Sequence, residues 1–276
     1  MAASPQDTWI WHPDWQDGAD ADSAGGMIHF RRTIHLKTVP TKPEFIEITA
    51  DTKYKLFINS RLVYSGPVKG DEHMWFYDHL DIQPYLKTGP NFFHVRVLRL
   101  YYATPFATSF PRLPHAGLLI RSTGLTDIAS NKEWDTAIDH STRLPIDIEE
   151  DAFLHIYESA DSRKESRIEW KSAKELQFSV SHGISSPWKL SPRMIPSPTS
   201  DSVPFKRIHN IRSSEPRESW EDAIFKTDSN GIRLAAGTSH HVELEAPNHI
   251  TAFLQFVFQR LPTSGSTLRV IPTTPR

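Results

Sequence analysis

The stretch that decides the fold is ITADTKYKLFINSRLVYSGPVKGDEHMWFYDHLDI, residues Ile48–Ile82. Every second residue in Tyr54–Ile58 is apolar, and the same rhythm resumes at Leu62 after the pair Asn59-Ser60. Side chains of a strand alternate between its two faces, so this rhythm indicates two strands. Asparagine tolerates the left-handed backbone of a tight turn. The pattern therefore predicts a β-hairpin that turns at Asn59.

The same alternation recurs along the chain. It is clear in residues 27–36 (MIHFRRTIHL), where the pair Arg31-Arg32 suggests a bulge, and in residues 91–100 (NFFHVRVLRL). In the second segment Phe93, Val95 and Val97 occupy the face opposite His94, Arg96 and Leu98. Residues 117–122 and 188–198 are expected to form further strands. The 21 prolines interrupt helix interiors, so we expect an all-β protein, with one short helix between residues 148 and 173.

The Pro- and Ser-rich stretch PSPTSDSVP marks a domain boundary. We expect a jelly-roll, galactose-binding-like β-sandwich over residues 8–195, a linker over 196–203 and an incomplete second β-sandwich over 204–276. Residues 231–236, 240–246 and 250–261 are expected strands of that second part. The apolar face of the strand at 250–261 lacks a partner in so short a segment, which predicts self-association.

Composition excludes several classes of protein. The chain has 276 residues, a formal net charge of −2 and no cysteine. A protein without a basic surplus is poorly suited to nucleic acid, and disulfides and thiolate metal sites are impossible. The sequence begins without a signal-peptide pattern and has no apolar run long enough to span a membrane. We therefore expect a cytoplasmic protein with no membrane partner, leaving open secretion by another route.

The sequence resembles a known family in several segments. These are residues 30–36 (FRRTIHL), 50–112, 187–196 (PWKLSPRMIP), 208–211 (IHNI) and 234–259. They look like the N-terminal region of fungal α-L-rhamnosidase-like glycoside hydrolases. Members of that family continue into an (α/α)₆ barrel that holds their catalytic carboxylates. No run of long amphipathic helices occurs here, so the resemblance implies a truncated member, a split gene product or a stand-alone module.

Candidate sugar-binding residues lie in and after the opening stretch. Asp71 could accept hydrogen bonds from sugar hydroxyls, together with the neighbouring His73. Asp71 and Glu72 cannot form a catalytic pair, because adjacent residues of an extended chain point to opposite sides. The plainer interpretation is a solvated loop in which Asp71 caps a turn.

Aromatic side chains supply the other candidates, because a ring can pack on the CH-rich face of a sugar. Trp75 and Tyr77 share one face of a predicted strand, and either this face or the opposite one belongs to the core. Tyr101, Tyr102 and Phe106 belong to a Pro-rich loop, and loops on a rigid sandwich often bind ligands. All of these rings could equally be structural.

No catalytic, metal-binding or cofactor-binding motif is apparent. The 14 histidines include no pair with metal-ligand spacing, and neither GxSxG nor a phosphate-binding glycine loop occurs. We expect a non-catalytic module that binds a rhamnoside or plant glycoside weakly. Two alternatives stay open: a purely structural bracing module, and α-L-rhamnosidase activity if further sequence supplies the catalytic domain. For this chain alone we expect no turnover of an aryl rhamnoside.

Overall fold

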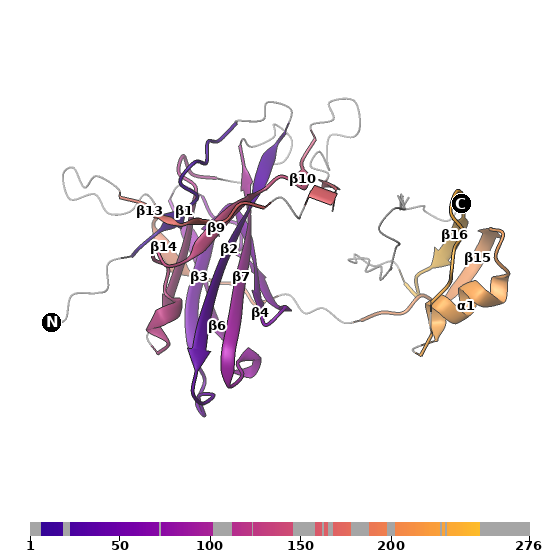
Figure 1. Cartoon of the computed structure of the whole chain (residues 1–276), viewed down its shortest axis with the longest axis horizontal. Helices are drawn as coiled ribbons and strands as arrows, with labels where there is room; N and C mark the ends of the chain where they lie inside the picture. The colour runs from indigo at the N-terminus through magenta and orange to yellow at the C-terminus, as the bar shows by residue number, and fades with distance from the viewer. Residues whose placement is uncertain are drawn as a thin grey trace. The chain divides into compact units, whose positions relative to one another are not determined.

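The chain divides into two compact units, residues 1–196 (unit 1) and 197–276 (unit 2). The computed structural model in Figure 1 describes residues 7–18, 23–71, 73–101, 112–122, 124–145, 158–161, 163–164, 168–177, 188–197, 202–226, 228–229 and 231–248. The described part contains no helix with the length and apolar character that a bilayer crossing requires.

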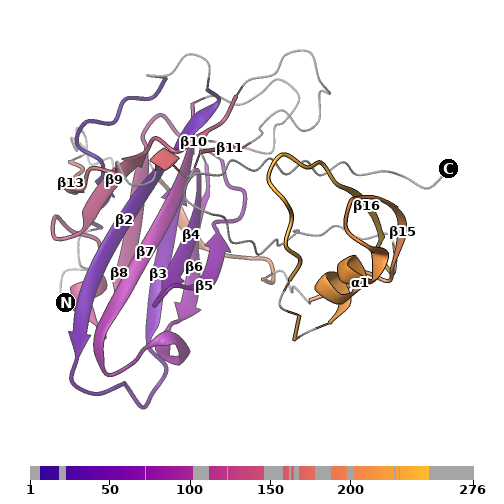
Figure 2. The same ribbon diagram turned by 45° about the vertical axis from the view of Figure 1, so that its right-hand side comes forward.

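The described residues of unit 1 form two six-stranded sheets, a two-stranded ladder and two 3₁₀ turns. Sheet 1 has the strand order β13-β1-β8-β3-β6-β14, and sheet 2 the order β12-β9-β2-β7-β4-β5. Figure 2 shows β2, β7, β4 and β5 side by side in one layer. The elements are β1 (Ile10–Trp11), β2 (Gly25–Leu36), β3 (Phe45–Asp51), β4 (Lys53–Ile58), β5 (Arg61–Gly66), β6 (Trp75–Asp81), η1 (Gln83–Tyr85), β7 (Gly89–Leu100), β8 (Gly117–Ser122), η2 (Thr126–Ile128), β9 (Asp135–Asp139), β10 (Thr142–Arg143), β11 (Ser159–Ala160), β12 (Lys171–Ser172), β13 (Lys174–Glu175) and β14 (Leu190–Pro192).

The core lies between the two sheets and follows from their alternation. Sheet 1 contributes Ile48 and Ile120, and sheet 2 contributes Phe30, Leu56 and Val95, all nearly inaccessible to solvent. Burying apolar area of this kind stabilises a fold by roughly 25 cal/mol per Å². The expected all-β sandwich is thus confirmed.

The longest ladder joins β2 and β7 without interruption. It runs antiparallel from Gly25 opposite Leu100 to Leu36 opposite Gly89. The bulge expected at Arg31-Arg32 is therefore absent from this pairing. Arg31 lies opposite His94 and Arg32 opposite Phe93, and Nη1 of Arg32 donates to the carbonyl of Glu133 (2.7 Å).

The predicted hairpin is confirmed as β4 and β5. Asn59 and Ser60 both adopt positive φ, 52° and 66°, the backbone twist of a two-residue type I′ turn. The Asn59 side chain anchors the turn: its Nδ2 donates to the carbonyl of Tyr85 (2.9 Å) and its Oδ1 accepts from the N–H of Phe92 (3.1 Å). The strand expected in residues 188–198 also forms, as β14, parallel to β6 with Leu190 opposite Trp75.

Unit 2 differs from expectation in its described residues. Strands β15 (Arg207–Arg212) and β16 (His241–Glu245) pair antiparallel, and the helix α1 (Arg217–Phe225) lies between them in sequence. The helix was not expected. Two ion pairs support it, each between residues four apart in sequence: Arg217–Glu221 (3.1 Å) and Asp222–Lys226 (2.6 Å).

Two further predictions concern residues 231–236 and 250–261 of unit 2, and a third concerns the helix predicted in unit 1. Residues 231–236 form a loop and not the predicted strand, since no described strand pairs with them. The strand predicted at 250–261 lies outside the described residues, as does more than half of the segment 148–173. The described residues of that segment include the strands β11 and β12 and no α-helix, so the predicted helix is wrong there. Self-association stays a prediction, because the strand at 250–261 lies outside the described residues.

Candidate functional site

Asp71 caps a turn in the loop before β6. Its Oδ1 accepts hydrogen bonds from the backbone N–H groups of His73 (2.8 Å) and Met74 (2.9 Å). These bonds lower the pKa of Asp71 below its ordinary value. The geometry agrees with the plainer interpretation of Asp71, and His73 lies exposed in the same turn.

Trp75 belongs to the core and not to an open surface. It is 2% exposed and packs with the buried Trp9, Leu119 and Trp188. These side chains cover the ring and leave no open face for a sugar, in contrast to the prediction. Tyr77, two residues on, is half-buried, and the Arg121 guanidinium lies 5.6 Å from the centre of its ring.

Tyr101 is the described member of the predicted aromatic loop. It is half-buried, its N–H donates to the carbonyl of Ala24 (2.8 Å), and its ring centre lies 5.9 Å from that of Trp15. Tyr102 and Phe106 lie outside the described residues. The sugar-binding role of this loop therefore stays a prediction.

A different group of side chains gathers on the face of sheet 2 that points away from sheet 1. Because alternate residues of a strand share a face, the positions between the core residues of β2, β7, β4 and β9 all project here. We call this group the outer-face cluster. It comprises His29, Arg31, Phe57, His94, Arg96 and Asp139, with Trp170 from the segment before β12.

Two histidines and an aspartate form the centre of the outer-face cluster. Nδ1 of His29 lies 2.8 Å from Nε2 of His94, and Nε2 of His29 lies 3.3 Å from Oδ2 of Asp139. The ionised Asp139 accepts a hydrogen bond from the Nε2–H of His29, and His94 bonds to the other ring nitrogen of His29, Nδ1.

The pKa values of His94 and Asp139 are both shifted from their ordinary values. Burial, together with the neighbouring His29 and Arg96, lowers the pKa of His94 from 6.5 to about 4. Burial raises the pKa of Asp139, but hydrogen bonds from His29, Ser141 and Thr142 outweigh that effect and hold it well below its ordinary value. At neutral pH His94 is therefore uncharged and Asp139 is ionised.

The lowered pKa of His94 predicts a stability effect. The unfolded chain binds this proton at a pKa of 6.5, whereas the folded chain binds it only at about 4. The stability associated with neutral His94 is thus complete above pH 6.5 and is lost as pH falls toward 4. At about 1.4 kcal/mol per pKa unit the loss approaches about 3 kcal/mol.

Two measurements check this prediction. NMR titration of the imidazole C2 proton should place the His94 midpoint near 4; a midpoint at or above 6 contradicts it. In urea unfolding, the stability advantage of the wild type over His94→Gln should shrink as pH falls from 6.5 toward 4. The difference between variants is used because burial raises the pKa of Asp51 to about 6, which contributes a slope of opposite sign.

An aromatic cavity lies at one end of the outer-face cluster. The Arg31 guanidinium stacks 4.0 Å from the ring centre of Trp170, and its Nε donates to Asp135 (3.0 Å). The half-exposed Phe92 and Thr33 complete the rim, and the space encloses about 260 Å³. Cavities with aromatic walls and a few polar groups are the usual form of small-ligand sites.

A second cavity of about 260 Å³ lies near the other end, over β4, β5 and β7. Its lining residues are Met27, Lys53, Tyr54, Lys55, Ser65, Gly66, Pro67, Arg96, Leu98 and Glu158. The two cavities open on the same face of sheet 2, with His29 and His94 between them along β2 and β7. An extended ligand could contact both.

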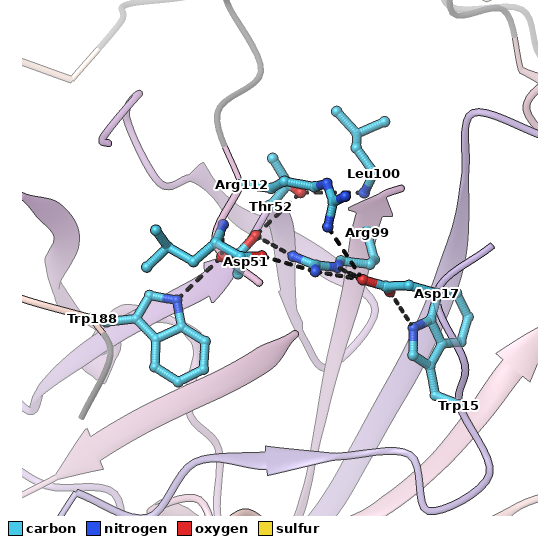
Figure 3. Close-up of polar contacts among 9 residues, drawn as sticks. Trp15, Asp17, Asp51, Thr52, Arg99, Leu100, Arg112 and Trp188 are labelled. Carbon is cyan, nitrogen blue, oxygen red and sulfur yellow. Dashed lines mark hydrogen bonds and ion pairs between the residues drawn. The ribbon is translucent and has the colours of Figure 1, made fainter. Parts of the chain in front are cut away.

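Figure 3 shows a buried ionic network that is structural in character. Arg99 lies between Asp51 and Asp17: its Nη1 donates to Asp51 (2.7 Å) and its Nη2 to Asp17 (2.6 Å). Arg99 and Asp51 are both 0% exposed. Because Asp51 ends β3 of sheet 1 and Arg99 lies near the end of β7 of sheet 2, the pair ties the two sheets together.

The described residues include no group of three or more His, Cys, Asp or Glu side chains that could hold a metal ion. In the outer-face cluster the metal-type ligands His29 and Asp139 are already bonded to each other.

Comparison with known proteins gives structural neighbours alone. No protein-family model and no curated protein matches the chain. A GH78 family rhamnosidase of Bacillus sp. GL1 is 24% identical with a TM-score of 0.56, over 76% of this chain and 22% of that one. α-L-Rhamnosidases from Dictyoglomus thermophilum and Aspergillus terreus are 17% and 20% identical, with TM-scores of 0.49 and 0.47, over 76% of this chain and 24% of theirs.

The first of these likenesses shows the fold of this chain. The chain spans less than a quarter of the length of each neighbour. The first neighbour comes from a bacterium, so it does not single out the fungal members of the family that the sequence resembles.

Proposed function

We propose that the chain is a non-catalytic, carbohydrate-associated module that binds a glycan on the outer face of sheet 2. The observation that carries the proposal is the aromatic cavity formed by Trp170, Arg31 and Phe92 on an otherwise rigid sheet. The likeness in fold to part of a rhamnosidase supports the choice of a sugar as ligand. A rhamnoside is the first ligand to test, in keeping with the sequence resemblance.

The geometry suits a sugar for two reasons. A pyranose presents a CH-rich face, which can pack against the half-buried indole of Trp170. Its hydroxyls need donors and acceptors, and the guanidinium of Arg31 and the carboxylate of Asp135 lie beside the ring. Since both side chains of this pair are about half exposed (50% and 48%), they remain accessible to a ligand.

The proposal predicts that Trp170→Ala weakens binding. L-Rhamnose and a rhamnosylated flavonoid are titrated into the full chain and followed by amide and indole NMR shifts. We expect shifts at Trp170 and His94 at millimolar sugar, and at least about a tenfold loss of affinity in Trp170→Ala, as for aromatic hot spots elsewhere.

Phe45→Ala is the matched control. Phe45 is an exposed ring (43%) on sheet 1, where it stacks on His79, and its loss should leave binding unchanged. Shifts confined to Tyr77 and Tyr101 would move the site to residues that the sequence suggested. The absence of shifts with any sugar would reject the proposal and favour the bracing module.

A further inference from the structure

The cavity over β4, β5 and β7 is rich in cations. Lys53, Lys55 and Arg96 line it, and Glu158 is the one carboxylate among its lining residues. Its floor is apolar: Met27 and Leu98 pack there against Ala24 and Leu144. A ligand held in this cavity meets an apolar surface below and positive charge at the sides.

The two lysines differ in how they are held. Lys53 donates from Nζ to the carbonyl of Pro67 (2.8 Å), and burial lowers its pKa. Lys55 projects from β4 into the solvent, and no described residue makes an ion pair or hydrogen bond with its ammonium group. Lys55 is thus the cation most available to a ligand.

Not all N–H groups of the Arg96 guanidinium are hydrogen-bonded to described residues. One Nη2 contact is a hydrogen bond to Thr142 (3.2 Å), and Nη2 lies 4.0 Å from Glu158, at the limit of an ion pair. Asp139, 3.8 Å away, is already bonded to other groups, including Ser141. Nε of Arg96 is buried with no partner among the described residues. Hydrogen bonds between charged groups are strong, so a carboxylate that reached the remaining donors of this guanidinium would be favoured.

We infer that this cavity binds the carboxylate of an acidic sugar residue, a uronic acid, within the glycan that the module recognises. The inference rests on the proposed function and names the chemical class of its ligand. A uronate presents a planar anion to Arg96 and Lys55 and a CH-rich ring face to Met27 and Leu98. The volume of about 260 Å³ is below that of typical drug-sized sites and suits one sugar residue.

The test compares two ligands of the same size. Trigalacturonate and its fully methyl-esterified form are titrated into the full chain by NMR at low salt. The charged form is expected to bind at least about tenfold more tightly, since hydrogen bonds to charged groups are worth roughly twice neutral ones. The difference should shrink as salt is raised, because Lys55 is exposed.

Two variants make the test specific. Lys55→Met should remove most of the preference for the charged form, whereas Lys55→Arg should retain it. Lys42→Met, which changes the same charge on an exposed residue of the loop before β3, should have no effect. Lys55 is exposed, so its substitution is not expected to disturb folding.

The outcomes separate the two proposals. Equal binding of the acid and the ester, or an unchanged preference in Lys55→Met, overturns the uronate inference and leaves glycan binding intact. Binding of a rhamnoside without any binding of trigalacturonate does the same. Failure of every sugar to bind rejects both.

Discussion

Replacing Arg99 with methionine is expected to lower the free energy of unfolding of unit 1 by about 3–5 kcal/mol, the usual cost of breaking a buried ion pair from one side. Arg99 is 0% exposed. Its guanidinium forms ion pairs with Asp51 and Asp17 and donates a hydrogen bond to the carbonyl of Leu113 (2.9 Å). Without the guanidinium, Asp51 would stay buried beside methionine with its charge uncompensated. Urea unfolding followed by tryptophan fluorescence measures the loss.

The pH dependence of this loss identifies its cause. Burial already raises the pKa of Asp51 to about 6, and removing Arg99 raises it further. Because a protonated Asp51 needs no cation, the loss in Arg99→Met should become smaller as pH falls toward 6 from above and should level off below 6. The double variant Asp51→Asn with Arg99→Met should lose less than the sum of the two single variants.

Arg31→Met is the control for the charge change. Its ion pair with Asp135 is half exposed (50% and 48%), and such pairs contribute about 0.2–1 kcal/mol. A loss in Arg99→Met no larger than the loss in Arg31→Met would show that the buried pair does not join the sheets as described.

The second large effect is expected at Trp188. Its ring stacks on Trp9 with ring centres 3.7 Å apart and planes 17° apart, and it is 3% exposed. Gly117 makes room for the stack, since a Cβ there would lie 2.6 Å from Trp9 and 3.1 Å from Trp188. Replacing a buried tryptophan with alanine costs about 3–5 kcal/mol. We expect Trp188→Ala to destabilise unit 1 by that amount.

Trp188→Phe separates packing from hydrogen bonding. Phenylalanine preserves a stacked ring but removes the Nε1–H that donates to Asp51 (3.2 Å), so we expect a loss of about 1–2 kcal/mol. Because Trp188 and Arg99 bond to the same carboxylate, their losses should not add. Additive losses, or a Trp188→Ala variant as stable as wild type, would contradict the described packing.

Local sequence pattern predicted much of the strand structure of this protein. The hairpin at Asn59 followed from one dipeptide between two apolar alternations, because backbone torsion and side-chain period are properties of neighbouring residues. The same period separated Val95 and Val97 from His94 and Arg96, and so placed the polar side chains on the outer face. It was less informative for Trp75, since a strand segment does not reveal whether its outward face is covered.

The arrangement of the outer-face cluster depended on strand order. His29 and His94 are 65 residues apart in sequence and Asp139 lies further along, yet β9, β2 and β7 are adjacent in sheet 2 and bring them into contact. Clusters of outward-facing His and Arg at alternate positions were a signal in the sequence, but nothing local states which strands pair. Sequence period thus determined which side chains leave the core, and long-range pairing alone decided which of them meet.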